Sequence, residues 1–384
     1  MAEQKKTPAT VNTIQRVSWA YFVLLVVVAP VAIAVLVYRV DEFDPAPLPD
    51  HGLSRVTVEV PKHNNRVLDA AERVGDGLLH GPEDLAYDAE SGIIYTGCSD
   101  GWIKQVTVKD SAEQTRVENW VYVGGRPLGL AFGPDKQLIV AESYKGLLKV
   151  NREGLVELLT DEADGVKFRL TDGVDVANDG MIYFTDASYK YDLDHHMLDI
   201  LEGRPYGRLM SFDPSTNQTQ ILVRHLYFAN GVALSPDQSF LVFCETPRRR
   251  CSKYHIKGER KGSVDNFIDN LPGFPDNIRY DGDGHFWIAL PSAKTLSWDV
   301  VLRYPYVRKT MAILSKYMHL PNIQRDGGVL AVNLEGKAVA LYSDPSLSMV
   351  SGGLKIGKYL YYGNLENAHF TRINLTRHAA SASS

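Results

Sequence analysis

The chain has 384 residues and a globular composition, with 45% hydrophobic and 23% charged residues, which excludes a disordered, collagen-like or coiled-coil protein. Lys and Arg number 41 against 46 Asp and Glu, a net charge of −5, so the chain has no general attraction for phosphate backbones and no nucleic-acid partner is expected. Three cysteines are too few for a disulfide-dense scaffold and lack the paired spacing of a structural zinc site.

The first predicted element is a transmembrane helix at residues 17–38, an apolar run without a formal charge. Its length matches the roughly 20 residues that span a bilayer. Basic residues precede the run and acidic residues follow it, so the positive-inside rule places residues 1–16 in the cytosol and the rest of the chain across the membrane. We expect a retained signal-anchor of a single-pass type II protein of the secretory pathway. A cleaved signal peptide and a buried core helix are the alternatives.

Several features beyond the anchor suit a lumenal or extracellular domain. Residues 39–51 contain three alternating prolines and are predicted to form a stiff, exposed spacer. Asn217 and Asn374 each begin a glycosylation acceptor pattern. Cys244 and Cys251 flank a predicted hairpin turn and either form a disulfide or remain two unpaired structural cysteines. We expect the endoplasmic reticulum as the compartment, with vacuole or plasma membrane as alternatives.

One pattern then recurs six times: a small or polar residue, a short apolar strand, a tight polar turn and a second apolar strand. The copies begin at Pro82, Pro127, Thr171, Ala229, Pro275 and Ser351. A period of about 40–50 residues with short strands and Gly/Asp turns is typical of a β-propeller. We therefore predict an all-β fold, a six-bladed β-propeller over residues 52–377, followed by a disordered tail at 378–384. A β-sandwich with coincidental turns is the alternative.

The last copy leaves room for only three strands before the chain ends. The segment Arg55–Val60, with the sequence RVTVEV, alternates as a strand does. We predict that it supplies the fourth strand of the last blade and so closes the ring without open edges.

Two loops are longer than the repeat requires, and both fall on the face where the innermost strands begin. Three residues of the loop at 187–206 are predicted to contact substrate: Tyr189, Tyr191 and His195. In the loop at 291–325, apolar residues follow helical spacing: Val307, Met311, Leu314 and Met318. This spacing predicts an amphipathic lid helix; a packing helix over the ring and contact with a membrane surface are the alternatives.

The residues that open each copy converge on the axis of a propeller, where the innermost strands begin. Four of them offer side-chain oxygens: Glu83, Asp172, Asn230 and Asp276. Asn277 directly follows Asp276 and is a fifth candidate ligand. Ca²⁺ takes 6–8 oxygen ligands, and three facing carboxylates repel one another unless a cation or bound protons neutralise them. We predict one Ca²⁺ site in the central channel. The alternative is that these residues only open turns, against which Glu83 argues.

Several segments resemble a known family, among them GRPLGLAFG at 125–133, FANGVALSPD at 228–237 and LPGFPDNI at 271–278. On these motifs, in order over roughly residues 50–375, the chain resembles strictosidine synthase-like proteins, above all the anchored branch typified by adipocyte plasma membrane-associated protein. The resemblance implies a six-bladed propeller related to paraoxonases, gluconolactonases and diisopropyl-fluorophosphatase. Those relatives are Ca²⁺-dependent esterases, lactonases or phosphotriesterases.

The resemblance also implies roles for individual residues. Glu83 matches the first-blade calcium ligand of those hydrolases, Asn230 their fourth-blade asparagine, and Asp276 with Asn277 their fifth-blade pair. Asp172 stands where the relatives usually have asparagine, which adds a negative charge. The catalytic glutamate of strictosidine synthase itself corresponds to Ser351 or Gly352, so an amine–aldehyde condensation is disfavoured.

These observations favour a membrane-anchored, Ca²⁺-dependent hydrolase of esters or lactones, similar to an arylesterase. Asp276 is the candidate general base or nucleophile, and the substrate is expected to be lipophilic or aromatic. The alternatives are a non-catalytic, membrane-tethered propeller that binds a small molecule or a protein, and the disfavoured condensing synthase.

Overall fold

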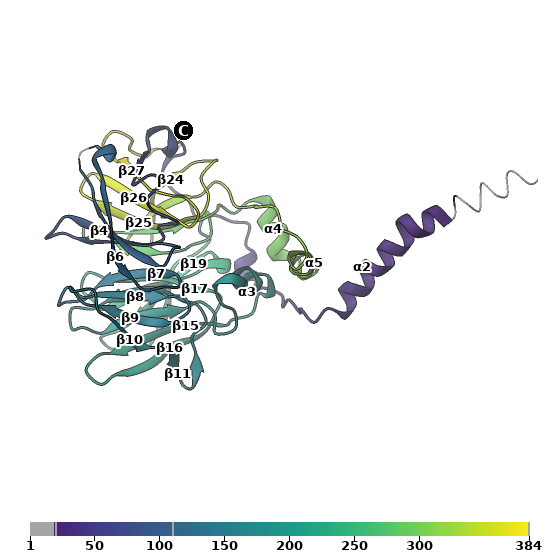
Figure 1. The fold of residues 1–384 in the computed structure, drawn as a ribbon, viewed down its shortest axis with the longest axis horizontal. Helices are drawn as coiled ribbons and strands as arrows, with labels where there is room; N and C mark the ends of the chain where they lie inside the picture. The colour runs from purple at the N-terminus through teal and green to yellow at the C-terminus, as the bar shows by residue number, and fades with distance from the viewer. Residues whose placement is uncertain (1–18, 20, 110, 383–384) are drawn as a thin grey trace, which may run out of the picture.

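Figure 1 shows the computed structural model, which describes residues 19, 21–109 and 111–382. An apolar helix projects from one side of a ring of β-sheets, and the short helices α3 (His196–Glu202), α4 (Leu296–Arg303) and α5 (Pro305–Ser315) lie on that side of the ring. The predicted cytosolic segment at 1–16 and the start of the apolar run lie outside the described residues.

The N-terminal helix is formed by a π-turn, Leu24–Val28, and α2, Ala29–Val40. Pro30 lies where the π-turn passes into α2; it has no N–H to donate, and a local π adjustment of this kind is one way in which a membrane helix tolerates a proline. Within the described residues, one helix is long and apolar enough to cross a membrane: Tyr21–Val40, with a mean hydropathy of 2.7 and 0% of it buried. This agrees with the predicted anchor.

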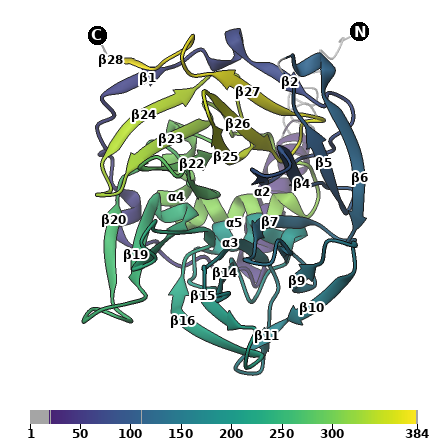
Figure 2. The same cartoon turned by 90° about the vertical axis from the view of Figure 1, so that its left-hand side faces the viewer.

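Six sheets form a closed ring around a central channel, which confirms the predicted six-bladed β-propeller (Figure 2). The first blade contains β3 (Leu85–Asp88), β4 (Ile93–Gly97), β5 (Trp102–Thr107) and β6 (Arg116–Tyr122). The second contains β7 (Pro127–Phe132), β8 (Leu138–Glu142), β9 (Gly146–Val150) and β10 (Val156–Thr160). The third contains β13 (Thr171–Val176), β14 (Ile182–Asp186), β15 (Gly207–Asp213) and β16 (Gln218–Leu226).

The fourth blade contains β17 (Ala229–Leu234), β18 (Phe240–Glu245), β19 (Arg250–His255) and β20 (Val264–Ile268). The fifth contains β21 (Ile278–Tyr280), β22 (His285–Leu290), β23 (Gly328–Asn333) and β24 (Ala338–Ser343), and the sixth contains β25 (Val350–Ile356), β26 (Tyr359–Asn364), β27 (Phe370–Asn374) and β2 (Glu72–Val74). A small hairpin, β11 (Glu162–Ala163) with β12 (Val166–Lys167), lies outside the blades.

The apolar cores lie between neighbouring blades. Phe184 and Phe212 of the third blade, for example, pack with Ile139 and Ala141 of the second. Equivalent clusters join each other pair of neighbours, including the sixth blade and the first. The ring is therefore held by six similar contacts between blades, and the channel at its centre is left for polar groups.

The prediction that residues 55–60 form the strand that closes the ring is wrong. Residues 55–60 form no strand; instead Val58 donates its N–H to the carbonyl of Asn270 (2.8 Å), and Val60 is buried between the fourth and fifth blades. The alternating valines therefore fill a seam between blades. Closure comes from β2, which pairs antiparallel with β27 and sets Val74 opposite Phe370.

Segments that precede and follow the blades in the chain add two strands to the fifth blade. β1 (Lys62–Asn64) extends the fifth blade parallel to β24, and β28 (Ser381–Ala382) pairs antiparallel with β1. The prediction of a disordered tail at 378–384 is therefore wrong at Ser381–Ala382, because the exposed edge of β1 offers these residues backbone partners.

The spacer is not exposed as predicted. Leu48 is buried among α3 (His196–Glu202), α4 (Leu296–Arg303) and α5 (Pro305–Ser315). Ala46 donates its N–H to the carbonyl of Glu202 (2.8 Å) and accepts from Nη2 of Arg308 (2.6 Å). An extended chain has no internal hydrogen bonds, so its backbone groups are free to dock on the helices.

The structure places the two cysteines and the two asparagines that the sequence associated with the secretory pathway. Cys244 and Cys251 lie opposite each other on β18 and β19 and form a disulfide. Asn217 is exposed in the turn between β15 and β16, at the opposite end of the blade from the 187–206 loop. Asn374, at the end of β27, is half-buried. Glycosylation of these two asparagines stays a prediction.

The closing strand gives a test of the architecture. Val74→Ala should lower the free energy of unfolding by about 2 kcal/mol, since it removes two buried carbon atoms and leaves a small cavity beside Leu79 and Phe370. Denaturant titration would measure the loss. Arg73→Ala, on the same strand with a side chain 68% exposed, should change little; equal losses in the two variants would contradict the assigned closure.

Candidate metal centre and substrate cavity

Three carboxylates meet in the central channel. Ligand oxygens of Glu83, Asp172 and Asp276 all lie within 4.8 Å of one another. Glu83 lies two residues before β3, Asp172 lies in β13, and Asp276 lies two residues before β21, so each comes from the start of a different inner strand. All three side chains are buried. The structure thus brings together the carboxylates that the sequence predicted to meet.

Glycines beside these residues let the inner strands approach. A Cβ on Gly173, next to Asp172, would lie 2.8 Å from Cα of Gly231, and a Cβ on Gly231 would lie 2.6 Å from Cα of Asn277. Real Cβ atoms essentially never come so close. Any larger residue at these positions would push the strands, and with them the three carboxylates, apart.

Burial is the main cause of raised pKa values in the cluster. It raises the pKa of Asp276 to about 7 and holds the pKa of Glu83 and of Asp172 well above the usual range, and repulsion from Asp276 raises the latter two further. The guanidinium of Arg126 acts in the opposite direction on Glu83 and is outweighed. As it stands, the cluster favours bound protons or a bound cation.

A fourth carboxylate, Asp84, is already neutralised. It forms an ion pair with Arg279, whose Nε lies 3.0 Å from Oδ1, and it accepts from the backbone N–H of Leu85 and Leu130 (2.8 and 2.9 Å). The need for a cation therefore concerns Glu83, Asp172 and Asp276.

The oxygens that face the cluster fit a hard cation. Oε2 of Glu83 and Oδ1 of Asn230 are buried and have no hydrogen-bond partner among the described residues. Asn230 donates from Nδ2 to Oγ1 of Thr246 (3.3 Å), and Asn277 donates from Nδ2 to Oε1 of Glu83 (2.7 Å). Unpaired carboxylate and amide oxygens are ligands that Ca²⁺ prefers. The cluster could therefore hold a metal ion.

The cluster lies in the wall of a cavity of about 450 Å³, which Glu83, Asp172, Asn230 and Asp276 help to line. Most of the other lining residues are apolar, including Leu128, Leu170, Phe228, Phe274, Trp298 and Met349. A largely apolar cavity with a few convergent polar groups is typical of a small-molecule site.

The three residues predicted to contact substrate do not line this cavity. Tyr191 donates to Oε2 of Glu202 (2.6 Å), and Nδ1 of His195, an exposed residue, lies 2.7 Å from Oδ1 of Asp192. The ring of Tyr189 packs against Tyr206 and lies below the guanidinium of Arg208. These side chains instead make contacts within the loop and, through Tyr189, with Arg208 of β15, so the structure does not support the predicted substrate contacts.

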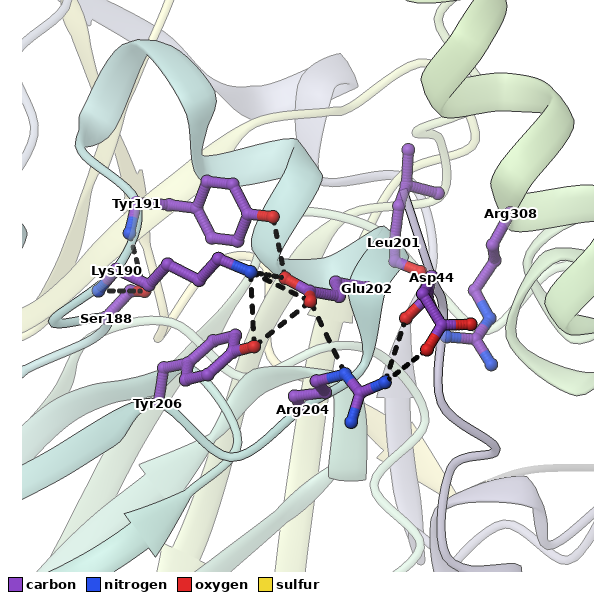
Figure 3. A network of polar contacts seen from close by, with 9 residues as sticks. All are labelled: Asp44, Ser188, Lys190, Tyr191, Leu201, Glu202, Arg204, Tyr206 and Arg308. Carbon is purple, nitrogen blue, oxygen red and sulfur yellow. Dashed lines mark hydrogen bonds and ion pairs between the residues drawn. The ribbon is translucent and has the colours of Figure 1, made fainter. Parts of the chain in front are cut away.

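Figure 3 shows what the loop does instead. Lys190, Tyr191 and Tyr206 converge on the carboxylate of Glu202, at distances of 2.6 to 3.0 Å. Arg204 extends the network to Asp44 of the spacer (2.7 Å). The loop therefore ties α3 to the chain that leads to α2.

Two cavity residues were not predicted. Arg126 lines the cavity with a buried Nη1 that has no partner among the described residues. Arg126 stands one residue before the second copy of the repeat, and this position near the start of an inner strand could have indicated that it lies near the channel. His196 also lines the cavity; Nδ1 must carry its proton because it lies 2.7 Å from the carbonyl of Leu193, and burial lowers the pKa of the ring. Nε2 is then a free acceptor.

Comparison with known proteins places the chain in a family. The family described as Strictosidine synthase matches residues 172–259, and Strictosidine synthase-like, N-terminal, matches residues 63–106. Protein strictosidine synthase-like 6 of Arabidopsis thaliana is 52% identical over 361 residues, 94% of this chain and 96% of that protein. The chain belongs to the strictosidine synthase-like family. Adipocyte plasma membrane-associated protein of Bos taurus is 31% identical over 337 residues, 81% of this chain and 80% of that protein.

Solved structures share the fold of this strictosidine synthase-like chain at low identity. A gluconolactonase from Xanthomonas campestris is 16% identical with a TM-score of 0.57, over 87% of this chain and 99% of that one. Regucalcin from Agrobacterium tumefaciens, described as a calcium-binding protein, is 15% identical with a TM-score of 0.56, over 82% and 95%. At this identity the likeness establishes the propeller alone.

The pKa of Asp276 predicts how stability depends on pH. Its folded-state value of about 7 is above the ordinary 3.8, so the folded protein binds this proton more tightly than the unfolded chain does. Without metal, stability should therefore fall as the pH rises from about 4 to about 7. In chelator, the melting temperature should be lower at about pH 8 than at about pH 5, and Ca²⁺ should raise it more at the higher pH. A Ca²⁺ effect independent of pH would argue against binding at these carboxylates.

Asp172→Asn separates repulsion from metal binding. The change removes one of three repelling charges and keeps an oxygen, so the melting temperature in chelator should rise. Calcium affinity, measured by calorimetry, should fall about tenfold, or about 1.4 kcal/mol. Glu153→Gln, an exposed change in the second blade, should alter neither quantity. A loss of stability in chelator would contradict the electrostatic account.

Proposed function

We propose that this protein is a membrane-anchored, Ca²⁺-dependent hydrolase of esters or lactones with lipophilic or aromatic groups. The observation that carries the proposal is the cluster of three buried carboxylates in the wall of a mainly apolar cavity of about 450 Å³. Such a cavity takes up the apolar part of a substrate while its polar end meets the cluster.

The comparisons support the same class of chemistry. One structure with this propeller is described as a gluconolactonase and another as calcium-binding. Condensation of an amine with an aldehyde is disfavoured: Ser351 is buried and donates its hydroxyl to the carbonyl of Glu83 (2.8 Å). A Cβ on Gly352 would lie 3.0 Å from the same oxygen. Both positions serve packing around the carboxylates.

Asp276 is the proposed general base. A water molecule loses a proton to its carboxylate while the water oxygen forms a bond to the substrate carbonyl carbon; the proton then passes to the leaving alkoxide oxygen as the ester carbon–oxygen bond breaks. When bound by Glu83, Asp172, Asn230 and Asp276, Ca²⁺ would supply positive charge that polarises the carbonyl. The apolar wall formed by residues such as Phe228 and Trp298 keeps bulk water away.

Arg126 is the proposed second polar contact. Its side chain lines the cavity, and its buried Nη1 has no hydrogen-bond partner among the described residues; the guanidinium can donate a hydrogen bond to an oxygen of the substrate. A guanidinium remains charged even when buried, so this contact would favour substrates with an acidic or strongly polar group near the scissile bond.

We also propose that α2 holds the propeller on the lumenal or extracellular side of a membrane of the secretory pathway, the endoplasmic reticulum first. The charge asymmetry around the apolar run supports this orientation. The disulfide between Cys244 and Cys251 supports an oxidising compartment.

Asp276→Asn tests the catalytic assignment. Turnover of aryl acetates and lactones by the full chain in detergent with Ca²⁺ should fall roughly 10²–10⁴-fold, the usual contribution of a general base, while the melting curve remains cooperative. His195→Ala, outside the cavity, should keep full turnover, and chelator should abolish it in the unsubstituted chain. Undiminished turnover in Asp276→Asn would refute the role of Asp276. A folded, Ca²⁺-bound chain without any turnover would favour the non-catalytic binding propeller.

A further inference from the structure

Helices α4 and α5 have apolar residues on two opposite faces. The inner face packs on the propeller side through Trp298, Val301, Leu302 and Ala312, all buried. A lid over the cavity requires apolar residues on this inner face only, and Trp298 of the inner face lines the cavity. The outer face of a helix on a soluble domain is normally polar, so apolar residues on that face require a separate explanation.

The outer face of the two helices and their ends carry a set of exposed apolar residues, here called the outer stripe. Its members are large side chains with 39–81% of their surface exposed: Leu296, Tyr304, Tyr306, Leu314, Tyr317 and Met318. Tyr306, Thr310 and Leu314 follow one another at four-residue spacing within α5, and residues so spaced share one helix face. Tyr317 and Met318 lie just after the end of α5 at Ser315. The rings of Tyr304 and Tyr306 lie 5.4 Å apart, which joins the stripe across the two helices.

The outer stripe lies next to the end of the membrane helix. Asp41, directly after α2, forms an ion pair with Lys316 (2.6 Å), and its carbonyl accepts from Nζ of Lys309 (2.8 Å). The same Nζ lies 5.1 Å from the centre of the Tyr38 ring in α2. Figure 1 shows α2 leaving the molecule from the side that carries α4 and α5. Tyr38 lies in the last turn of α2 and Asp41 directly follows that helix, and an α-helix rises only about 1.5 Å per residue. The contacts with these two residues therefore attach α5 at the depth where α2 leaves the bilayer.

We propose that the outer stripe lies in the surface of the bilayer that α2 crosses. Tyrosine and aliphatic side chains are the residues that settle at the boundary of headgroups and acyl chains. The two lysines beside the stripe are held by Asp41 and do not oppose its insertion. The inference rests on the membrane span of α2, not on the proposed hydrolysis. Its consequence is that α4 borders the substrate cavity on one face and lipid on the other.

Site-specific fluorescent labels test the proposal in the full chain, reconstituted in phosphatidylcholine vesicles. Cys98 is buried and the other cysteines are bonded to each other, so an introduced cysteine is the reactive one. Tyr317→Cys reports on the outer stripe. Glu90→Cys, exposed in the β3–β4 turn on the opposite face of the ring, is the matched control. Val26→Cys, exposed on the apolar helix, reports on α2.

The label at 317 should be quenched several-fold by lipids that carry a nitroxide on the acyl chain and protected from iodide in the water, whereas the label at 90 should behave in the opposite way. Lipid quenching at 26 but not at 317 would overturn this inference and leave the anchor intact. No lipid quenching at either position would overturn the membrane span as well.

A second copy of the chain is the other possible occupant of the outer stripe. Protection from iodide at 317 without lipid quenching, increasing with the protein-to-lipid ratio, would establish that contact and overturn the proposal. Leu314→Ser gives an independent readout: it should leave the melting temperature unchanged and reduce lipid quenching at 317. Unchanged quenching in that variant would count against contact through the stripe.

Discussion

The structure depends on three carboxylates that are buried and held close together in the central channel. Their repulsion would open the channel, yet the inner strands approach so closely at Gly173 and Gly231 that no larger residue fits. The contacts between blades hold the ring shut, and Arg279 neutralises the neighbouring Asp84. What remains is a site to which four blades contribute an oxygen and whose charge must be balanced by protons or by a cation.

The sequence predicted the ring and its centre because both depend on the repeat. Each copy fixes the start of an inner strand, and the convergence of Glu83, Asp172 and Asp276 follows from that position alone. The closing strand was not predictable in the same way, since Glu72–Val74 has only three residues and no room for an alternating pattern. Residues 55–60, which alternate over a longer stretch, instead pack between two blades. Apolar residues at alternate positions are as suitable for such packing as they are for a strand in a sheet.

The cavity wall was predicted less well than the channel because loops take their conformation from distant partners. Tyr191 and Tyr206 turn toward Glu202, a residue of the same loop, whereas His196 of that loop lines the cavity. Nothing in the spacing of these residues distinguishes the two directions. The docking of the spacer likewise depends on Arg308, far along the chain, and a proline-rich segment gives no sign of such a partner.

The pairing of β2 with β27 also determines when the molecule can be completed. Glu72 lies opposite Arg372, so β2, near the start of the propeller, waits for β27, near its end. At roughly 5–20 residues per second, synthesis of the intervening 300 residues takes roughly 15–60 s. During that time β2 has no partner while α2 can already be in the membrane, and contacts between such distant segments form slowly. Closure of the ring therefore requires that this short strand stay free of other pairings until β27 has been synthesised.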